Sequence, residues 1–446
     1  MTHPPTAIDL LIEARWIAPV DPDVLLEHHA LAIHQGRIVA LLPINEARQR
    51  FLPTARRCLE HHLLIPGLIN LHTHAAMNLL RGIADDLPLM EWLQKHIWPA
   101  ESRHLSPAFV LDGTRLACAE MLRGGTTCFN DMYFHPEASA RAAREAGMRA
   151  VIGITTLEFP TPYASDADDY LHKGLAVREL WLDDPLIRFA LAPHAPYTVS
   201  DRSFERIVTL AEQLNLPIHC HVHETAQEVA DSLARDGRRP LQRLQALGVP
   251  GPGLTAVHAV HLDDADIALL AASGSHVAHC PTSNLKLASG IAPLTRLLAA
   301  GVNVGLGTDG AASNNRLDLF AEMRLASLLA KGSSGDASTV PARQALRMAT
   351  LQAANALGLG DRIGSLTPGK EADLCAVDLS APECRPCFDP VSQLIHVAGR
   401  DAVSHVWVAG KCCVEAKKLV NNPPGSRQYD LEGMLTLWQN KLDVCR

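Results

Sequence analysis

The sequence lacks the features that would attach the protein to a membrane or to a polyanion. No stretch approaches the roughly 18 uninterrupted apolar residues that a membrane-spanning helix requires. Its 40 Lys and Arg residues are outnumbered by 48 Asp and Glu residues, and the formal net charge of −8 argues against nucleic acid, which binds clustered positive charge. Asp9 and Glu13 lie where a secretory signal would be basic and then apolar. We therefore expect a cytoplasmic protein with neither a membrane nor a nucleic-acid partner.

The cysteines give no sign of a disulfide framework, because their number, 11, is odd and they are spread along the chain. Reduced thiols of a cytosolic protein are the simpler interpretation. Cys384 and Cys387 form a CxxC pair, but the stretch around them is rich in Pro and holds no second pair. We interpret this pair as part of a surface loop, with a zinc or redox role as the alternative.

What the chain does have is enough apolar content for a large core and a regular alternation of two patterns. It is 47% hydrophobic, and its 446 residues suit one large barrel or two to three domains. Short apolar runs typical of strands lie at 63–71, 126–131, 149–155, 187–193, 216–222, 254–259, 275–280 and 302–308. Segments with apolar residues at helical spacing separate them, for example 138–146, 201–214, 263–272 and 316–331. Eight strands that alternate with helices predict an α/β fold, a closed parallel (β/α)₈ barrel of the TIM type over residues 63–363.

The two ends of the chain carry a different pattern. Residues 8–60 and 364–415 show short alternating apolar runs around glycine turns, which favours small antiparallel sheets. We infer that residues 1–62 and 364–446 together build one small β-sandwich domain, with a tail at the C-terminal end. Periodicity alone does not show that the two ends pair.

A His-x-His pair at the end of the first barrel strand is the starting point for a functional site. His72 and His74 are two residues apart, so a strand points both imidazoles to the same side. With 22 His in the chain, about one such pair is expected by chance, so its meaning depends on the neighbouring strands. Catalytic groups of such a barrel sit where the strands end. The predicted strand ends gather seven candidates: His72, His74, His194, His221, Glu224, His258 and Asp309.

The types of these residues indicate metal-dependent hydrolysis. Three His and one Asp suit Zn²⁺, with Fe²⁺ or Mn²⁺ as alternatives, and such an ion makes hydroxide available at neutral pH. Asp309 can bind the ion and accept a proton from water, and Glu224 can act as general acid and base. His258 can hydrogen-bond the attacking oxygen. The alternative for Asp309 is a turn residue before Gly310.

Other histidines near this rim are interpreted differently. His219 and His223 alternate with His221, so we expect that they do not face the metal with it. His279 ends the seventh strand, where it either lines the pocket or is an ordinary buried histidine.

Six longer motifs carry a resemblance that covers nearly the whole chain. They are residues 71–93, 130–135 (NDMYFH), 193–198 (PHAPYT), 221–225 (HVHET), 281–293 and 307–329. With these motifs the sequence resembles the amidohydrolase superfamily, and within it the 5-methylthioadenosine/S-adenosylhomocysteine deaminases of the triazine-hydrolase-like branch.

The resemblance implies roles for particular residues. One divalent ion per subunit would be held by His72, His74, His221 and Asp309. No Lys stands near the end of the fourth strand, so a carbamylated bridging Lys is not expected. The resemblance further implies that Glu101 holds the ribose hydroxyls, that His194 contacts the substrate, and that Glu224 handles the purine ring nitrogen, with Asp309 also contacting the substrate. Members also build a composite β-sandwich from both termini.

The reaction expected from the resemblance is hydrolytic deamination of an adenine nucleoside, a C–N bond hydrolysis of a cyclic amidine. Relatives that accept S-adenosylhomocysteine can carry Arg in and after the third strand, but residues 153–170 contain no Arg or Lys, and Ile154 stands where a basic residue can occur. We therefore predict 5′-methylthioadenosine as the preferred substrate, and adenosine and S-adenosylhomocysteine as weaker ones. An Arg from another loop or subunit is the alternative, and we expect a homo-oligomer.

Two other functions remain open from the sequence. One is a deaminase or chlorohydrolase of another heterocycle, such as guanine, cytosine or a triazine, and Glu101 argues against it because a free base has no ribose diol. The other is a non-catalytic amidohydrolase-like protein, which would be expected to lose metal ligands that are all present here.

Overall fold

The structure is a computed structural model that describes residues 5–420 and 430–443. The chain divides into two compact units. One consists of the described residues of 1–69, 121–128 and 318–421, and the other of the described residues of 70–120, 129–317 and 422–446.

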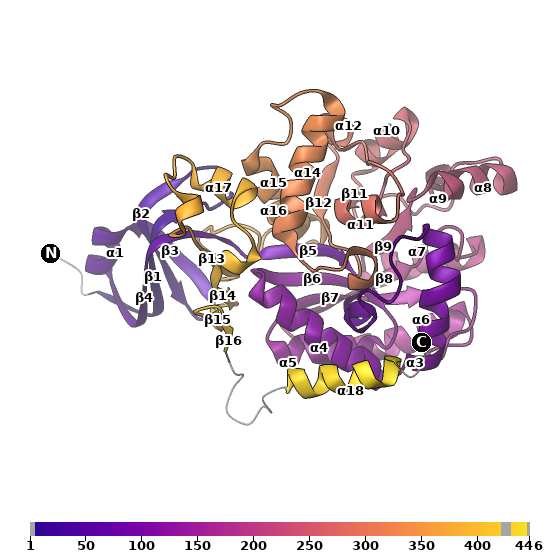
Figure 1. Ribbon diagram of the computed structural model, residues 1–446, viewed down its shortest axis with the longest axis horizontal. Coiled ribbons are helices and arrows are strands. Elements are labelled where there is room, and N and C mark those ends of the chain that lie inside the picture. Colours follow the sequence, from indigo (N-terminus) through magenta and orange to yellow (C-terminus); the bar gives the residue numbers. More distant parts are fainter. Residues whose placement is uncertain (1–4, 421–429, 444–446) are drawn as a thin grey trace. The chain divides into compact units, whose positions relative to one another are not determined.

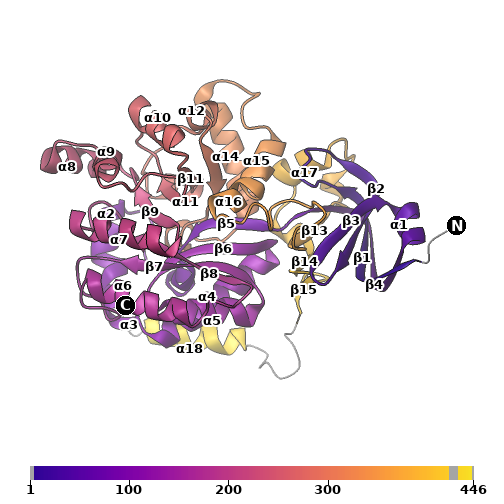
Figure 2. The ribbon, with the colours of Figure 1, turned by 180° about the vertical axis from the view of Figure 1, so that it is seen from behind.

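Eight strands form the barrel sheet, in the spatial order β12-β11-β10-β9-β8-β7-β6-β5 (Figures 1 and 2). They are β5 (Leu68–Thr73), β6 (Thr126–Tyr133), β7 (Arg149–Thr156), β8 (Ile187–Pro193), β9 (Ile218–Val222), β10 (Leu254–His258), β11 (His276–His279) and β12 (Asn303–Leu306). Neighbouring strands pair in parallel from β7 to β12. The backbone N–H groups of Thr308 and Asp309 donate to the carbonyl of His72, which brings the end of β12 to the end of β5. The nearly closed parallel barrel predicted from the alternating pattern is confirmed.

Helices follow the strands in the order that a (β/α)₈ fold requires. They include α4 (Pro107–Arg123), α5 (Pro136–Ala146), α6 (Ala167–Glu179), α7 (Asp201–Leu214), α8 (Ala226–Asp236), α9 (Pro240–Ala246), α10 (Asp264–Ser273), α11 (Pro281–Lys286), α12 (Leu294–Ala299) and α14 (Leu319–Ser334). Several begin at a side-chain cap: Ser200, Thr225 and Asp263 each accept a hydrogen bond from the N–H three residues later. These caps start α7, α8 and α10 between four and eight residues after the preceding strands end.

The first predicted strand, 63–71, is in fact parts of two strands. β4 (Phe51–Pro66) ends at Pro66 and β5 begins at Leu68. Gly67 lies between them, and a Cβ atom at this position would come within 2.1 Å of the Thr127 Oγ1 atom. Only glycine therefore allows the chain to pass Thr127 as it enters the barrel.

The two chain ends form a second sheet, of order β16-β15-β14-β13-β4-β1-β2-β3. Besides β4 it contains β1 (Thr6–Ile17), β2 (Leu26–His34), β3 (Arg37–Pro43), β13 (Leu374–Asp378), β14 (Val403–Val408), β15 (Lys411–Glu415) and β16 (Lys418–Leu419). The inferred pairing of the two ends is confirmed, because β4 pairs with β1 on one side and with β13 on the other. β1 and β4 are parallel, so the sheet is mixed rather than antiparallel throughout. Alternate residues of β1 enter different cores, Ile12 with Trp407 and Leu11 with Phe51.

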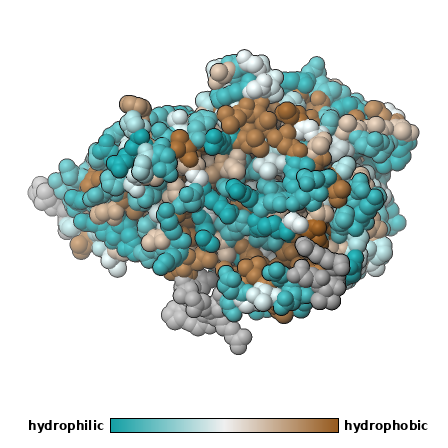
Figure 3. Space-filling model, in the orientation of Figure 1, coloured by the Kyte–Doolittle hydropathy of each residue, from teal (hydrophilic) through white to brown (hydrophobic). Residues whose placement is uncertain are grey.

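The remaining helices are shorter or stand outside the strand–helix alternation. They are α1 (Ile44–Arg50), α2 (Leu89–Trp92), α3 (Trp98–His104), α13 (Ala311–Asn314), α15 (Ala342–Met348), α16 (Leu351–Ala356), α17 (Pro390–His396) and α18 (Leu431–Asp443). None of the helices in the described residues is long and apolar enough to cross a membrane, and hydrophilic residues cover most of the face shown in Figure 3. Cys384 is buried and Cys387 half-buried, both as thiols outside any disulfide.

Candidate metal centre and active site

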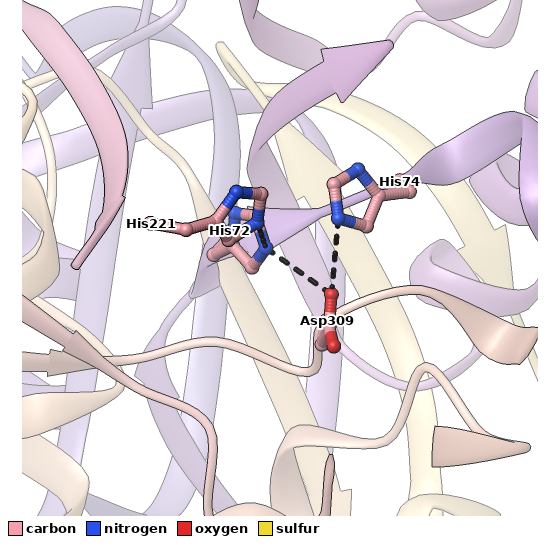
Figure 4. A group of neighbouring side chains, drawn as sticks. All are labelled: His72, His74, His221 and Asp309. Atoms are coloured by element: carbon pink, nitrogen blue, oxygen red, sulfur yellow. Dashed lines mark hydrogen bonds and ion pairs between the residues drawn. The ribbon is translucent and has the colours of Figure 1, made fainter. Parts of the chain in front are cut away.

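Four side chains converge at the carboxyl end of the barrel strands: His72, His74, His221 and Asp309, which we call the His₃Asp cluster (Figure 4). One possible ligand atom from each lies within 4.8 Å of the others. The Asp309 Oδ1 atom is 3.1 Å from His72 Nε2 and 3.2 Å from His74 Nε2. The Nε2 atoms of His72 and His221 are 3.2 Å apart. Three nitrogens and one carboxylate oxygen at these separations suit a divalent ion such as Zn²⁺.

The other ring nitrogens explain why the Nε2 atoms face the centre. The Nδ1–H of His74 donates to the Met132 carbonyl at 2.6 Å, and that of His221 donates to the His194 carbonyl at 2.7 Å. A carbonyl only accepts, so each ring keeps its proton on Nδ1, and in its neutral form it has a lone pair on Nε2. Hydrogen bonds of this kind orient the histidine ligands of metal sites.

Asp309 is held by two serines. The hydroxyls of Ser283 and Ser313 both donate to its Oδ2 atom at 2.6 Å, which leaves Oδ1 toward the histidines. Both serines are buried, and Asp309 itself has a left-handed backbone with φ of 61°. The carboxylate is therefore fixed in orientation before any ligand arrives.

Burial and mutual contact set the protonation of the cluster. Burial lowers the pKa of His72 to about 4, so this ring is neutral at pH 7. Burial also opposes protonation of His74, but the hydrogen bond and charge of Asp309 outweigh it and raise the pKa of His74 to about 9. Burial opposes ionisation of Asp309 as well, yet the hydrogen bonds from His72 and His74 hold its pKa well below the usual range. Without a cation, His74 and Asp309 thus share one proton, which a cation would displace.

A cavity of about 270 Å³ opens above the cluster, and its walls carry the other candidate residues. Beside three cluster residues, the titratable groups that line it are Glu101, Tyr133, His194, Tyr197, Glu224 and His258. No Lys or Arg lines the cavity among the described residues. The rest of the wall is largely apolar, formed by segments 89–105 and 155–162 and by single residues of other rim loops.

Glu224 and His258 lie side by side in this cavity. The Glu224 Oε2 atom is 3.8 Å from His258 Nε2, and burial raises the pKa of Glu224. His258 Nδ1 is 2.8 Å from the Asn284 side-chain oxygen, which orients the imidazole. A carboxyl group whose pKa is raised by burial is suited to proton transfer near neutral pH.

Glu101 lies in α3, within the same cavity wall. It is buried, and its Oε1 atom accepts a hydrogen bond of 2.7 Å from the Tyr133 hydroxyl. Burial raises the pKa of Glu101 to about 7, although the Tyr133 hydrogen bond counteracts this rise. A buried carboxylate without a Lys or Arg in the cavity is an acceptor for hydroxyl groups of a ligand.

Comparison with known proteins places this site in a family. The model of the amidohydrolase family matches residues 63–413. The chain belongs to this family. Among its relatives are two proteins named 5-methylthioadenosine/S-adenosylhomocysteine deaminase, from Saccharophagus degradans (52% identity; 99% of this chain, 98% of the relative) and from Teredinibacter turnerae (47% identity; 99% of each). The resemblance inferred from the sequence motifs is confirmed.

Solved amidohydrolase structures agree with this assignment. An adenosine deaminase from Xanthomonas campestris with bound zinc superposes with a TM-score of 0.96 at 50% identity, covering 99% of this chain and 100% of that one. A triazine hydrolase variant superposes with a TM-score of 0.87 at 25% identity, covering 97% and 98%. The latter likeness matches the triazine-hydrolase-like branch to which the sequence motifs pointed.

Within this amidohydrolase site, the reasoning on the strand-five histidines was wrong. Residues two apart share one face of a strand, so His219 and His221 both point into the barrel. His219 lies one layer deeper, and its Nε2 atom is 2.9 Å from His72 Nδ1. His223, with φ of 57°, leaves the strand and its Nδ1–H donates to the His261 carbonyl. Neither joins the His₃Asp cluster.

The expectation that Ile154 of the third strand stands where a basic residue could contact the substrate needs a similar correction. Ile154 is buried away from the cavity, close to Gly174 of α6, where a Cβ atom would come within 2.2 Å of its side chain. The neighbouring Thr155 lines the cavity instead. His279 is buried and does not line the cavity.

Sequence reasoning also missed residues that support the site. Tyr133, Ser283 and Ser313 all lie in the motifs that carried the resemblance. Tyr133 and Ser283 contact candidate residues 32 and 26 positions away, whereas Ser313 contacts Asp309 four residues before it. The sequence contains no signal for those contacts.

Proposed function

We propose that the protein is a metal-dependent hydrolytic deaminase of adenine nucleosides, with 5′-methylthioadenosine as its preferred substrate. The products would be 5′-methylthioinosine and ammonia. One observation carries the proposal: the His₃Asp cluster, the Glu224–His258 pair and the buried Glu101 face the same cavity. The names of the relatives from Saccharophagus degradans and Teredinibacter turnerae support the same substrate class.

The His₃Asp cluster would hold one divalent ion per subunit, most suitably Zn²⁺, with Fe²⁺ or Mn²⁺ as alternatives. Such an ion, when bound, lowers the pKa of water from about 15.7 toward 7. The neutral Nε2 atoms of the histidines and the fixed Oδ1 atom of Asp309 are the donors that it needs.

In the reaction, two different carboxyl groups of the chain carry out two separate proton transfers. Asp309 accepts a proton from the attacking water, whose oxygen adds to C6 of the purine ring. Glu224 delivers a proton to N1, so that negative charge does not accumulate on the ring. His258 hydrogen-bonds the attacking oxygen and stabilises the developing charge. The proton held by Asp309 then passes to the amino group, which leaves C6 as ammonia, while the new hydroxyl returns a proton to Glu224 and becomes the product carbonyl. His194, at the cavity wall, contacts the substrate.

Glu101 would select nucleosides over free bases. Its Oε1 atom is engaged by Tyr133, and the remaining carboxylate lone pairs can accept the 2′- and 3′-hydroxyls of a ribose. Guanine, cytosine and triazines have no such diol, so each would leave this carboxylate desolvated and unpaired.

The preference for a methylthio group follows from the wall near the third strand. Leu157, Phe159 and Pro160 line the cavity there, and no Lys or Arg among the described residues lines it anywhere. An amino-acid carboxylate would lack the bidentate Arg that usually binds it. A methylthio group instead gains about 0.8 kcal/mol for each buried carbon.

The test is to measure kcat/KM for 5′-methylthioadenosine, adenosine, S-adenosylhomocysteine, guanine and cytosine by ammonia release, and for a chlorotriazine by chloride release. We expect the first to be turned over best, adenosine more slowly, S-adenosylhomocysteine worst among the nucleosides, and the others not at all. Equal or better turnover of S-adenosylhomocysteine would refute the preference for 5′-methylthioadenosine and point to an Arg from a second subunit. Sedimentation of the same sample would detect the association of two subunits. Turnover of free bases alone would refute nucleoside deamination.

A further inference from the structure

The first turn of α8 contains a second buried carboxyl group, Glu228, that the mechanism above does not use. Thr225 caps α8, since its hydroxyl oxygen accepts the N–H of Glu228 at 3.1 Å. The Glu228 side chain then reaches backwards. Its Oε1 atom accepts the N–H of His223 at 3.0 Å, and its Oε2 atom accepts the N–H of Glu224 at 2.7 Å.

This arrangement goes beyond an ordinary capping box. In a capping box the residue at this position accepts the N–H of the cap itself, which here would be Thr225. Glu228 contacts Thr225 and also accepts the N–H groups of the two residues before the cap, so its contacts extend toward the cavity. Burial raises the pKa of Glu228 to about 7, and in its ionised form both hydrogen bonds are of the stronger, charge-assisted kind.

The two contacted residues are where the chain changes direction. His223 has a left-handed backbone with φ of 57°, a conformation that costs free energy for a residue other than glycine. Glu224 follows directly, and its carboxylate must leave this turn to lie 3.8 Å from His258 Nε2. Glu228 is itself only 8% exposed and does not line the main cavity, so it acts on the site through the backbone.

We propose that Glu228 is a positioning residue, whose carboxylate fixes the peptide groups of His223 and Glu224 so that the Glu224 side chain meets the substrate ring. This inference rests on the proposed function in one respect, the role of Glu224 as the proton donor. It assigns to Glu228 no contact with substrate or metal.

The experiment compares Glu228→Gln with the wild type in the metal-loaded enzyme. A glutamine has one acceptor oxygen and one NH₂ group, so it can accept only one of the two backbone N–H groups. We expect kcat for 5′-methylthioadenosine to fall about 10- to 100-fold, with KM within twofold and metal content unchanged. If Glu228→Gln does not fold, Glu228→Asp serves the same purpose, because its shorter side chain cannot reach both N–H groups.

A double-mutant cycle separates positioning from general destabilisation. In a Glu224→Gln background, measured at raised enzyme concentration, adding Glu228→Gln should change kcat less than threefold, because its target is already removed. Ser200→Ala is the matched control: it removes the cap of α7, after the preceding strand, and should lower the melting temperature without changing kcat.

The outcomes distinguish the positioning role of Glu228 from the proposed function. If Glu224→Gln lowers kcat but kcat of the Glu228 variant stays within twofold of wild type, the positioning role is overturned and the proposed function is left intact. If the double variant loses kcat by the product of the two single losses, the positioning role is also overturned, because independent losses indicate a structural effect. A Glu224→Gln variant within a few-fold of wild type would instead refute the role of Glu224 in the proposed function.

Discussion

Replacing Tyr133 with Phe removes one hydroxyl from the cavity wall and tests how Glu101 works. The Tyr133 hydroxyl donates to the Glu101 Oε1 atom at 2.7 Å, and this hydrogen bond favours the ionised carboxylate against burial. Only the ionised form offers every lone pair to the hydroxyls of a ribose. We therefore predict that the substitution weakens nucleoside binding in a pH-dependent way.

The magnitude follows from the strength of that hydrogen bond. A hydrogen bond to a charged group contributes about 1.5–3 kcal/mol, so its loss should raise the pKa of Glu101 by about 1–2 units. Starting from a pKa of about 7, the ionised fraction at pH 7 would fall from about one half to between about one tenth and one hundredth. The corresponding loss in kcat/KM for nucleosides at pH 7 is about 5- to 50-fold.

The assay is the pH dependence of kcat/KM for 5′-methylthioadenosine between pH 6 and pH 9. For the wild type we expect a rise centred near pH 7, as Glu101 loses its proton. For Tyr133→Phe the rise should shift to higher pH, so that the loss is small at pH 9. Tyr163→Phe is the control, because this buried hydroxyl has no hydrogen-bond partner among the described residues and does not line the cavity. A loss that is the same at every pH would refute the reasoning.

Four further predictions concern the cluster and its carboxylates. His221→Ala should abolish activity and lower bound metal; full metal occupancy in this variant would show that the strand-five ligand is assigned to the wrong histidine. Glu224→Gln should keep its metal and lose about 10²–10⁴ in kcat, and a rate within a few-fold of wild type would remove Glu224 from the mechanism. Glu101→Ala should raise KM for nucleosides while metal analysis remains unchanged; loss of metal would mean that its role is not confined to substrate binding. Zinc affinity of the metal-free protein, measured by competition with a chelator, should rise about tenfold per pH unit from pH 6 to pH 8 because one shared proton is displaced from His74 and Asp309; a flat profile would contradict this shared proton.

The positions of the strands, and hence of the rim, could be predicted from the sequence because each strand is a short apolar run that ends at a polar residue. The direction of side chains across the barrel wall could not. Every residue of β6 and of β7 is buried, so neither strand alternates between apolar and polar residues. Nothing in the pattern therefore distinguishes Ile154, outside the barrel, from Thr155, inside it. The contacts of Tyr133 and Ser283 could not be predicted from the sequence either, because their partners are 32 and 26 residues away in the chain.

The contact between His72 and His219 has a spectroscopic consequence. When His72 uses Nε2 for a cation, its proton must be on Nδ1, which then donates to His219 Nε2 at 2.9 Å. His219 must in turn carry its own proton on Nδ1, an atom with no hydrogen-bond partner among the described residues. Metal loading thus selects one tautomer for two rings in edge-to-face contact, although only the His72 ring would touch the ion. The nitrogen chemical shifts of His219 would accordingly report the occupancy of a site to which this residue contributes no ligand.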